Sequence, residues 1–234
     1  MTIEIFETEK ANYIANFGNH FTRTDPSLSE SIDALVVETG VNKGDRALEI
    51  LLMKKTNVHF DELIEKCISK RIPIYAVDIP PDCSRINKLK NELEILLTIP
   101  TGFIPVIYGF SNIKMNDFLA KLHSNYLYFM QFPRLEGRNA INAKKIEEFV
   151  VDRVNERLAY KPTIGLVYGA NHIGLKYDLL CKERRDKTIE TQRKKEFRGL
   201  DQTELNKVYA LNLENNTWYL KTFTTKLFQN NGEK

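Results

Sequence analysis

Short apolar runs separated by longer amphipathic segments are the feature of this sequence that most restricts its fold. Runs rich in Val, Ile and Tyr predict strands at Ile3–Phe6, Tyr13–Phe17, Ala34–Val37, Ile74–Val77, Ile104–Tyr108 and Thr163–Tyr168. Strands that alternate with helical segments are typical of βα units, not of a helical bundle or a β-sandwich. We therefore predict an α/β fold with a mainly parallel central sheet and helices on both of its faces.

Three segments between these strands predict helices. The clearest is Asn139–Ala159, in which Ile146, Val150, Val154 and Leu158 recur at every fourth residue. The opposite face of this helix carries charged residues and is expected to lie in solvent: Lys144, Lys145, Glu148, Asp152 and Arg153. Weaker helical patterns occupy Asp61–Lys70 and Ser84–Leu97.

The C-terminal part has a different pattern. Val208–Leu213 and Trp218–Phe223 alternate in polarity, and the turn residues Glu214-Asn215-Asn216 separate them. We predict a β-hairpin within residues 206–224 that extends the sheet or mediates a homodimer. The 234 residues contain no obvious linker and no repeat of solenoid length, so we expect one domain over residues 1–234, with its core at about 13–180.

Composition excludes several classes of protein. Three widely spaced cysteines form no Cys-x-x-Cys pair, so they predict reduced thiols and no zinc-thiolate site. No apolar run approaches the ~20 residues that span a bilayer, and the start of the chain does not resemble a secretion signal. We expect a cytoplasmic protein with no membrane partner.

The net charge of +3 is too small to predict nucleic-acid binding by itself. Basic residues do concentrate in the segment 182–198, but acidic residues interrupt them at regular intervals. A solvated helix or a mobile loop is the simpler interpretation, and a flap over a site is a second one. A regulatory or nucleic-acid-binding role through Lys182–Arg198 stays open as a minor alternative.

Four titratable residues follow four predicted strands: His20, Glu38, Asp78 and His172. The carboxyl ends of parallel strands share one edge of a sheet, where open α/β folds bind their ligands. Imidazole and carboxylate groups are good ligands for zinc, manganese, cobalt or iron, and a His/Glu pair can also transfer protons without a metal. The residues also have plainer interpretations, because acids after strands cap helices and loop histidines bond to the main chain.

Small and polar residues surround the two histidines. Gly18 and Gly169 allow tight turns and the close approach of a substrate. Together with these glycines, we assign three asparagines to substrate binding: Asn19, Asn139 and Asn171.

Two segments carry a resemblance to a known family. Glu136-Gly137-Arg138-Asn139 opens the long predicted helix, and Gly169-Ala170-Asn171-His172 follows the last predicted parallel strand. In this order, and with Glu38 at a strand end, they resemble the TraB/Tiki family over about residues 13–180. That family is related in fold to the erythromycin esterases and the ChaN-like proteins. Two features depart from the family pattern: a single residue separates Gly18 from His20, and no arginine follows Asp78.

The resemblance implies a hydrolase that acts as a peptidase or an esterase on a peptide or small molecule. In a metal-dependent version, His20, Glu38, Asp78 and His172 hold a divalent Mn, Co or Zn ion that activates water. In a metal-free version, one histidine is the general base and Glu38 fixes its tautomer. In both, Arg138 binds a carboxylate or stabilises an oxyanion, unless it forms a structural ion pair with Glu136. The main alternative is a non-enzymatic module that holds a small ligand or a haem at the same edge, as the ChaN-like relatives imply.

Overall fold

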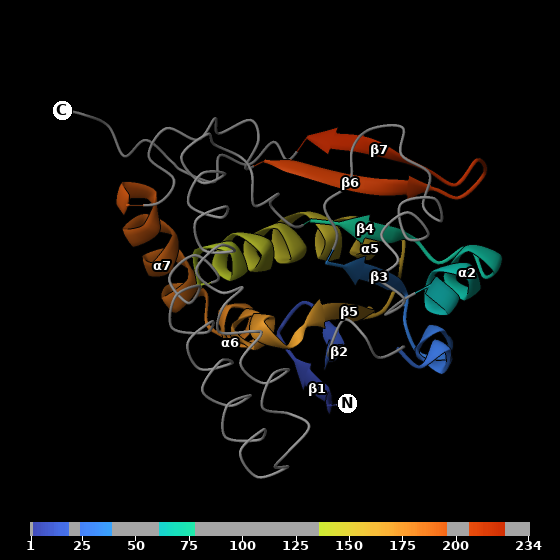
Figure 1. Ribbon diagram of the computed structural model, residues 1–234, viewed down its shortest axis with the longest axis horizontal. Helices are drawn as coiled ribbons and strands as arrows, with labels where there is room; N and C mark the ends of the chain where they lie inside the picture. The colour runs from blue at the N-terminus through green and yellow to red at the C-terminus, as the bar shows by residue number, and fades with distance from the viewer. Residues whose placement is uncertain (1, 19–23, 39–60, 78–135, 196–205, 223–234) are drawn as a thin grey trace, which may run out of the picture. The chain divides into compact units, whose positions relative to one another are not determined.

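The computed structural model describes residues 2–18, 24–38, 61–77, 136–195 and 206–222 (Figure 1). Apart from Glu136, these residues belong to one compact unit made from two stretches of chain, residues 1–79 and 137–234. The predicted strand Ile104–Tyr108 and the predicted helix Ser84–Leu97 lie outside the described residues. That the whole chain forms one domain stays a prediction.

A mixed sheet organises this unit. Its strands are β1 (Thr2–Glu7), β2 (Asn12–Gly18), β3 (Ala34–Val37), β4 (Ile74–Ala76), β5 (Thr163–Gly169), β6 (Lys207–Asn212) and β7 (Thr217–Thr222). They form a seven-stranded sheet in the order β1-β2-β5-β3-β4-β6-β7. The four central strands are parallel, whereas β1 at one end and the hairpin β6–β7 at the other are antiparallel. The predicted α/β class, the parallel centre and the C-terminal hairpin are confirmed.

Strands β3 and β4 at the centre of the sheet have no strongly polar residue, as fits strands with both faces covered. All residues of β3 and of β4 are buried, as expected of parallel strands inside an α/β sheet. Their register brings the carboxyl ends together: Gly18 pairs with Gly169, and Val37 pairs with both Val167 and Ala76. The ends of β2, β5, β3 and β4 therefore form one edge of the sheet.

The described helical segments are η1 (Pro26–Glu30), α2 (Asp61–Ser69), η3 (Ala170–Ile173), α6 (Gly174–Leu180) and α7 (Lys182–Lys195). Residues 136–155 are also helical throughout, and we call them the long helix. They include a π-helical segment, η2 (Ile146–Val151), and end in α5 (Asp152–Asn155).

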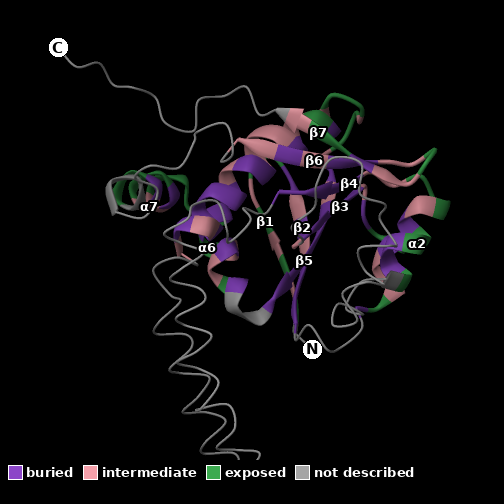
Figure 2. Cartoon of the chain, turned by 45° about the horizontal axis from the view of Figure 1, so that its top comes forward, coloured by how far each residue is buried: buried purple, intermediate pink, exposed green. Residues whose placement is uncertain are grey.

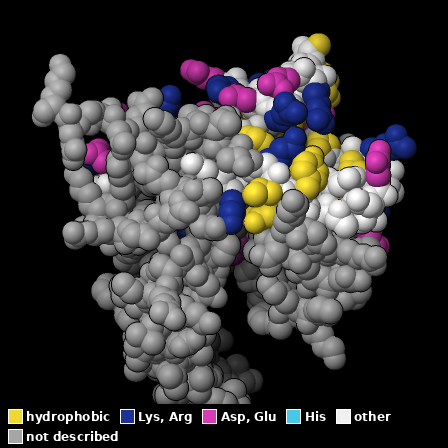
Figure 3. Space-filling view, turned by 90° about the horizontal axis from the view of Figure 1, so that it is seen from above, with side chains coloured by type: hydrophobic (Ala, Val, Ile, Leu, Met, Phe, Trp, Pro, Cys, Tyr) yellow, Lys and Arg dark blue, Asp and Glu magenta, His cyan; other side chains and the backbone are white. Residues whose placement is uncertain are grey.

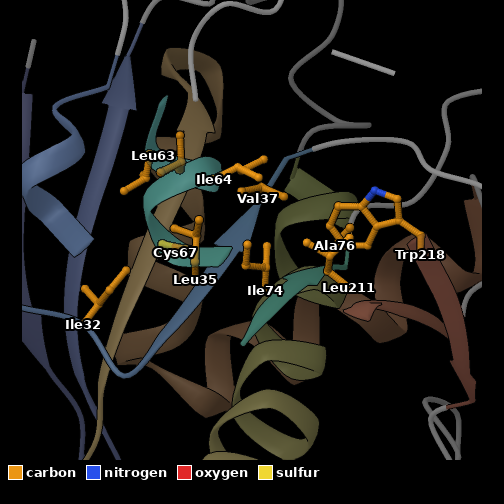
Figure 4. Close-up of a cluster of buried hydrophobic side chains, with 11 residues drawn as sticks. Ile32, Leu35, Val37, Leu63, Ile64, Cys67, Ile74, Ala76, Leu211 and Trp218 are labelled. Atoms are coloured by element: carbon orange, nitrogen blue, oxygen red, sulfur yellow. The ribbon is translucent and has the colours of Figure 1, made fainter. Parts of the chain in front are cut away.

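Helix α2 covers one face of the sheet. Its side chains Leu63, Ile64 and Cys67 join a buried cluster with side chains of β3, β4 and the hairpin (Figure 4). Trp218 of β7 belongs to the same cluster and is 2% exposed. Burial raises the pKa of the Cys67 thiol to about 12.

The long helix lies on the opposite face. Tyr75 alternates with Ile74 and Ala76 along β4 and therefore points away from α2. Its ring meets Phe149 of the long helix edge-on, with 6.4 Å between the ring centroids. Figure 2 shows the sheet nearly edge-on between α2 on one side and α6 on the other.

One residue of the long helix is placed differently from the prediction. Lys145 was expected on a solvated face, but it is fully buried. The sequence pattern placed Lys145 with the charged residues on the face opposite Ile146, Val150 and Val154. Ile141, which lies four residues before Lys145 and on the same side of the helix, is also fully buried, so this side of the helix faces the core at Lys145. The predicted exposure of Lys145 was therefore wrong.

The basic segment forms a packed helix over its described part, Lys182–Lys195. Arg185 is fully buried and Ile189 is 4% exposed. The Arg185 guanidinium donates a hydrogen bond to the Glu147 carboxylate of the long helix. This arginine thus serves an internal contact and is not available to a phosphate, while the nucleic-acid role of the segment stays a prediction.

Candidate functional site

Two of the four predicted strand-end residues lie against each other. Glu38 directly follows β3, and His172 lies in η3 directly after the neighbouring strand β5. The Nε2 atom of His172 is 3.0 Å from Oε1 of Glu38. The structure thus brings together these two residues, as expected for parallel strands with a common edge.

The Glu38 carboxylate is held at both oxygens. While Oε1 faces His172, Oε2 accepts a hydrogen bond of 2.5 Å from the Gly169 main-chain N–H. The main-chain N–H of Glu38 donates to the Val167 carbonyl at 2.9 Å. Hydrogen bonds from a main-chain donor and from an imidazole both stabilise the ionised carboxylate. The Glu38 side chain is 14% exposed and the His172 side chain 3%, so Glu38 is the more accessible of the two.

Asn139 completes this arrangement from the long helix. Its Oδ1 atom lies 2.6 Å from Nδ1 of His172, and the residue is 3% exposed. Both ring nitrogens of His172 therefore face an oxygen. A ring with protons on both nitrogens donates to Glu38 and Asn139 at once, whereas a ring with one proton donates to only one of them. We call these three side chains the Glu38–His172–Asn139 chain.

Gly174 allows Asn139 to approach. It is the first residue of α6, and a Cβ atom built on it would lie 2.9 Å from Nδ2 of Asn139. Real Cβ atoms do not come so close to a nitrogen, so any larger residue would have to displace the amide. The glycine thus leaves space for the amide that contacts His172.

The described residues do not by themselves fit a metal site. No three side chains of His, Cys, Asp or Glu cluster within the described ranges as metal ligands would. Both oxygens of Glu38 and both nitrogens of His172 already face partners inside the protein. His20 and Asp78 lie outside the described residues, so a Mn, Co or Zn site built from all four residues stays a prediction.

The remaining predicted site residues are only partly described. Gly18 ends β2 and pairs with Gly169 at the edge that carries Glu38. Asn19 lies outside the described residues, and of Asn171 only the main chain is described, within η3. Arg138 precedes Asn139 in the long helix and is half-buried. The substrate-binding and catalytic roles assigned to these residues stay predictions, including that of Asn139.

Sequence reasoning missed Lys145 near this edge. Its Nζ atom donates to the Val77 carbonyl at 3.1 Å and to the Lys207 carbonyl at 2.9 Å. Val77 directly follows β4, the strand beside β3. No sequence signal distinguishes Lys145 from its neighbour Lys144, whose side chain lies 3.9 Å from Glu148.

Two surface properties bear on partners. Among the described residues, no helix is both long enough and apolar enough to cross a membrane. On β7, Tyr219 and Leu220 are 38% and 37% exposed, and the Lys221 ammonium lies 5.4 Å from the centre of the Tyr219 ring. Figure 3, seen from above, shows hydrophobic and basic side chains side by side on the described surface. A homodimer formed through the hairpin stays a prediction.

Comparison of this chain with protein-family models, with curated proteins and with solved structures gives no match. The resemblance to the TraB/Tiki family therefore rests on the sequence motifs alone and stays a prediction.

Proposed function

We propose that this protein is a TraB/Tiki-like hydrolase that cleaves an ester or peptide bond at the carboxyl edge of its parallel strands. The observation that carries the proposal is the Glu38–His172–Asn139 chain, with its distances of 3.0 and 2.6 Å. A carboxylate that is bonded to an imidazole, which is in turn oriented by a third group, is a common arrangement for proton transfer in hydrolysis.

The exposure of the two residues supports a division of roles. Glu38, at 14% side-chain exposure, takes a proton from the attacking water. His172 is more deeply buried, at 3% exposure, and contacts Glu38 from inside the protein. His172 is then a positioning residue that donates to the carboxylate, and Asn139 fixes the ring. This division exchanges the roles expected for a metal-free site, in which a histidine was the base. The reason is that Nδ1 of His172 faces Asn139 and Nε2 faces Glu38, so neither ring nitrogen faces a substrate water.

Neighbouring groups support binding of the substrate. Arg138, one residue before Asn139, supplies a cation for a substrate carboxylate or a developing oxyanion. Gly18 and Gly169 lie side by side at the strand ends and leave room for a substrate main chain. The substrate is a peptide or a small ester, and the reaction takes place in the cytoplasm.

A substitution at Glu38 tests this proposal. Hydrolysis of p-nitrophenyl esters and of fluorogenic peptides is compared between the wild type and Glu38→Gln, which keeps the shape and removes the base. We expect kcat/KM to fall by about 100-fold or more, as for loss of a general base. Glu7→Gln is the matched control, because Glu7 is 76% exposed and pairs with Lys161 at 3.2 Å, away from the site. It is expected to keep wild-type activity.

Two results would contradict the proposal. Glu38→Gln with wild-type activity would remove Glu38 from the mechanism. A wild type that hydrolyses none of the substrates, but gives a Soret band with haemin, would favour the binding module instead.

A further inference from the structure

Lys145 is a buried cation at a place where an apolar residue would fill the same volume. It is fully buried, and moving an ammonium out of water is unfavourable unless hydrogen bonds compensate for it. Two main-chain carbonyls do so, those of Val77 and Lys207. Val77 directly follows β4, and Lys207 is the first residue of β6.

The two carbonyls lie where the pairing of β4 with β6 ends. The paired residues are Tyr75 with Ala210, and Ala76 with Tyr209. Val77 follows the last pair on β4, and Lys207 precedes it on β6. The ammonium of Lys145 therefore joins the two strands just beyond their ladder, where it supplies donors to both carbonyls.

This contact lies one strand away from Glu38. Val37 pairs with Ala76 in the parallel register of β3 and β4, so Glu38 and Val77 are the next residues on adjacent strands. Adjacent strands are about 4.8 Å apart. Through Asn139 and His172 the long helix also contacts the segment after β5, on the other side of β3. One helix thus holds the chain on both sides of Glu38.

We propose that Lys145 is a positioning residue of the site, an inference that rests on the proposed hydrolase function. Its ammonium fixes the main chain at Val77 and links the C-terminal hairpin to the edge that carries Glu38. Lys145 touches no substrate and acts through the placement of Glu38. Small displacements of a catalytic group lower rates strongly, by up to about 100-fold for 1 Å.

The first experiment removes the ammonium and keeps the volume. In Lys145→Met, both carbonyls lose the donor that Lys145 supplies, so we expect Tm to fall by about 5 °C or more. We expect kcat to fall by about 10- to 100-fold with little change in KM. Lys144→Met is the matched control on the same helix, since Lys144 has only a partly exposed contact of 3.9 Å with Glu148. It is expected to retain the wild-type Tm and kcat.

The second experiment is chemical rescue of a variant that lacks the lysine side chain. A merely structural role would not predict that the rescue restores kcat. Lys145→Ala leaves a space that propylammonium matches, because a lysine side chain beyond Cβ consists of three carbons and an ammonium. Propylammonium is expected to raise the Tm of this variant and to raise its kcat by at least about fivefold. Tetramethylammonium has the same charge but no N–H donor, and is expected to raise neither.

The outcomes separate this inference from the proposed function. A wild type without hydrolytic activity defeats the proposed function. An active wild type together with a fully active Lys145→Met variant defeats the role of Lys145. Equal rescue by propylammonium and tetramethylammonium also defeats it, because the donated hydrogen bonds would then have no part in the effect.

Discussion

Replacing Gly174 with alanine sets two physical effects against each other. Gly174 has φ −58° and ψ −26°, an ordinary right-handed helical conformation that alanine adopts readily. On that ground the substitution should stabilise the protein, because glycine in a helix is less stable than alanine by roughly 0.5–1 kcal/mol. The surroundings of Gly174 predict a loss of stability instead, because the new Cβ atom would lie 2.9 Å from Nδ2 of Asn139.

The contact should outweigh the helix propensity. Asn139 cannot move away without lengthening its 2.6 Å contact with His172, and a buried polar group that loses its partner costs about 1–3 kcal/mol. Gly174 is at the start of α6, where the gain from alanine is at the low end of its range. We expect Gly174→Ala to lower the free energy of unfolding by about 1–2 kcal/mol, or Tm by roughly 2–8 °C.

Urea unfolding followed by tryptophan fluorescence measures this change. Trp218 is the only tryptophan in the chain and is 2% exposed, so its emission reports on the buried cluster under α2. A double-mutant cycle with Asn139→Ala isolates the contact, and the cost of Gly174→Ala should disappear when the Asn139 amide is absent. Equal cost in both backgrounds, or a Gly174→Ala variant as stable as the wild type, would refute the reasoning.

Three further predictions concern reactivity, pH and metal content. Because burial raises the pKa of the Cys67 thiol to about 12, iodoacetamide at neutral pH should label the exposed Cys181 and spare Cys67; equal labelling by mass spectrometry would contradict this. The Tyr160 hydroxyl donates to Asp33 at 2.7 Å, and this hydrogen bond raises the Tyr160 pKa. The hydrogen bond therefore stabilises the fold below the ordinary pKa of tyrosine, and this stabilisation is lost as pH rises through the raised value. Asp33→Asn should return that pKa towards its ordinary value in an NMR titration, and an unchanged pKa would exclude the hydrogen bond as the cause. Since both ring nitrogens of His172 have protein partners, elemental analysis should find the same metal content in wild type and His172→Ala; loss of a stoichiometric metal would identify His172 as a ligand.

Most described elements could be predicted because their signals are local. Ala34–Val37 has the same bounds as predicted, since a short run of consecutive apolar residues is typical of a strand covered on both faces. The hairpin turn was also recognisable, and Asn216 adopts a φ of 55° there, a conformation that asparagine tolerates better than most residues. The strand order could not be predicted, because no local pattern indicates that β5 lies between β2 and β3.

The site was predictable only where it follows from strand ends. Glu38 and His172 could be paired because parallel strands share one edge. The contact of Asn139 with His172 depends on how the long helix crosses the sheet, which the spacing of its apolar residues does not define. Lys145 could not be distinguished from Lys144, because adjacent lysines carry the same local signal and only the packing of the long helix buries one of them.

The position of β5 in the sheet has a consequence for how the protein is made. β5 pairs on both sides, joining Asn12 of β2 to Thr163 and Ala34 of β3 to Ile164. Until the ribosome has synthesised β5, therefore, β2 and β3 cannot reach their final neighbour. At about 5–20 residues per second, the interval between β3 and β5 lasts on the order of ten seconds, during which β2 can pair only with β1 and β3 only with β4. The strand pair β1–β2 and the strand pair β3–β4 are consequently joined into one sheet only once β5 has been synthesised.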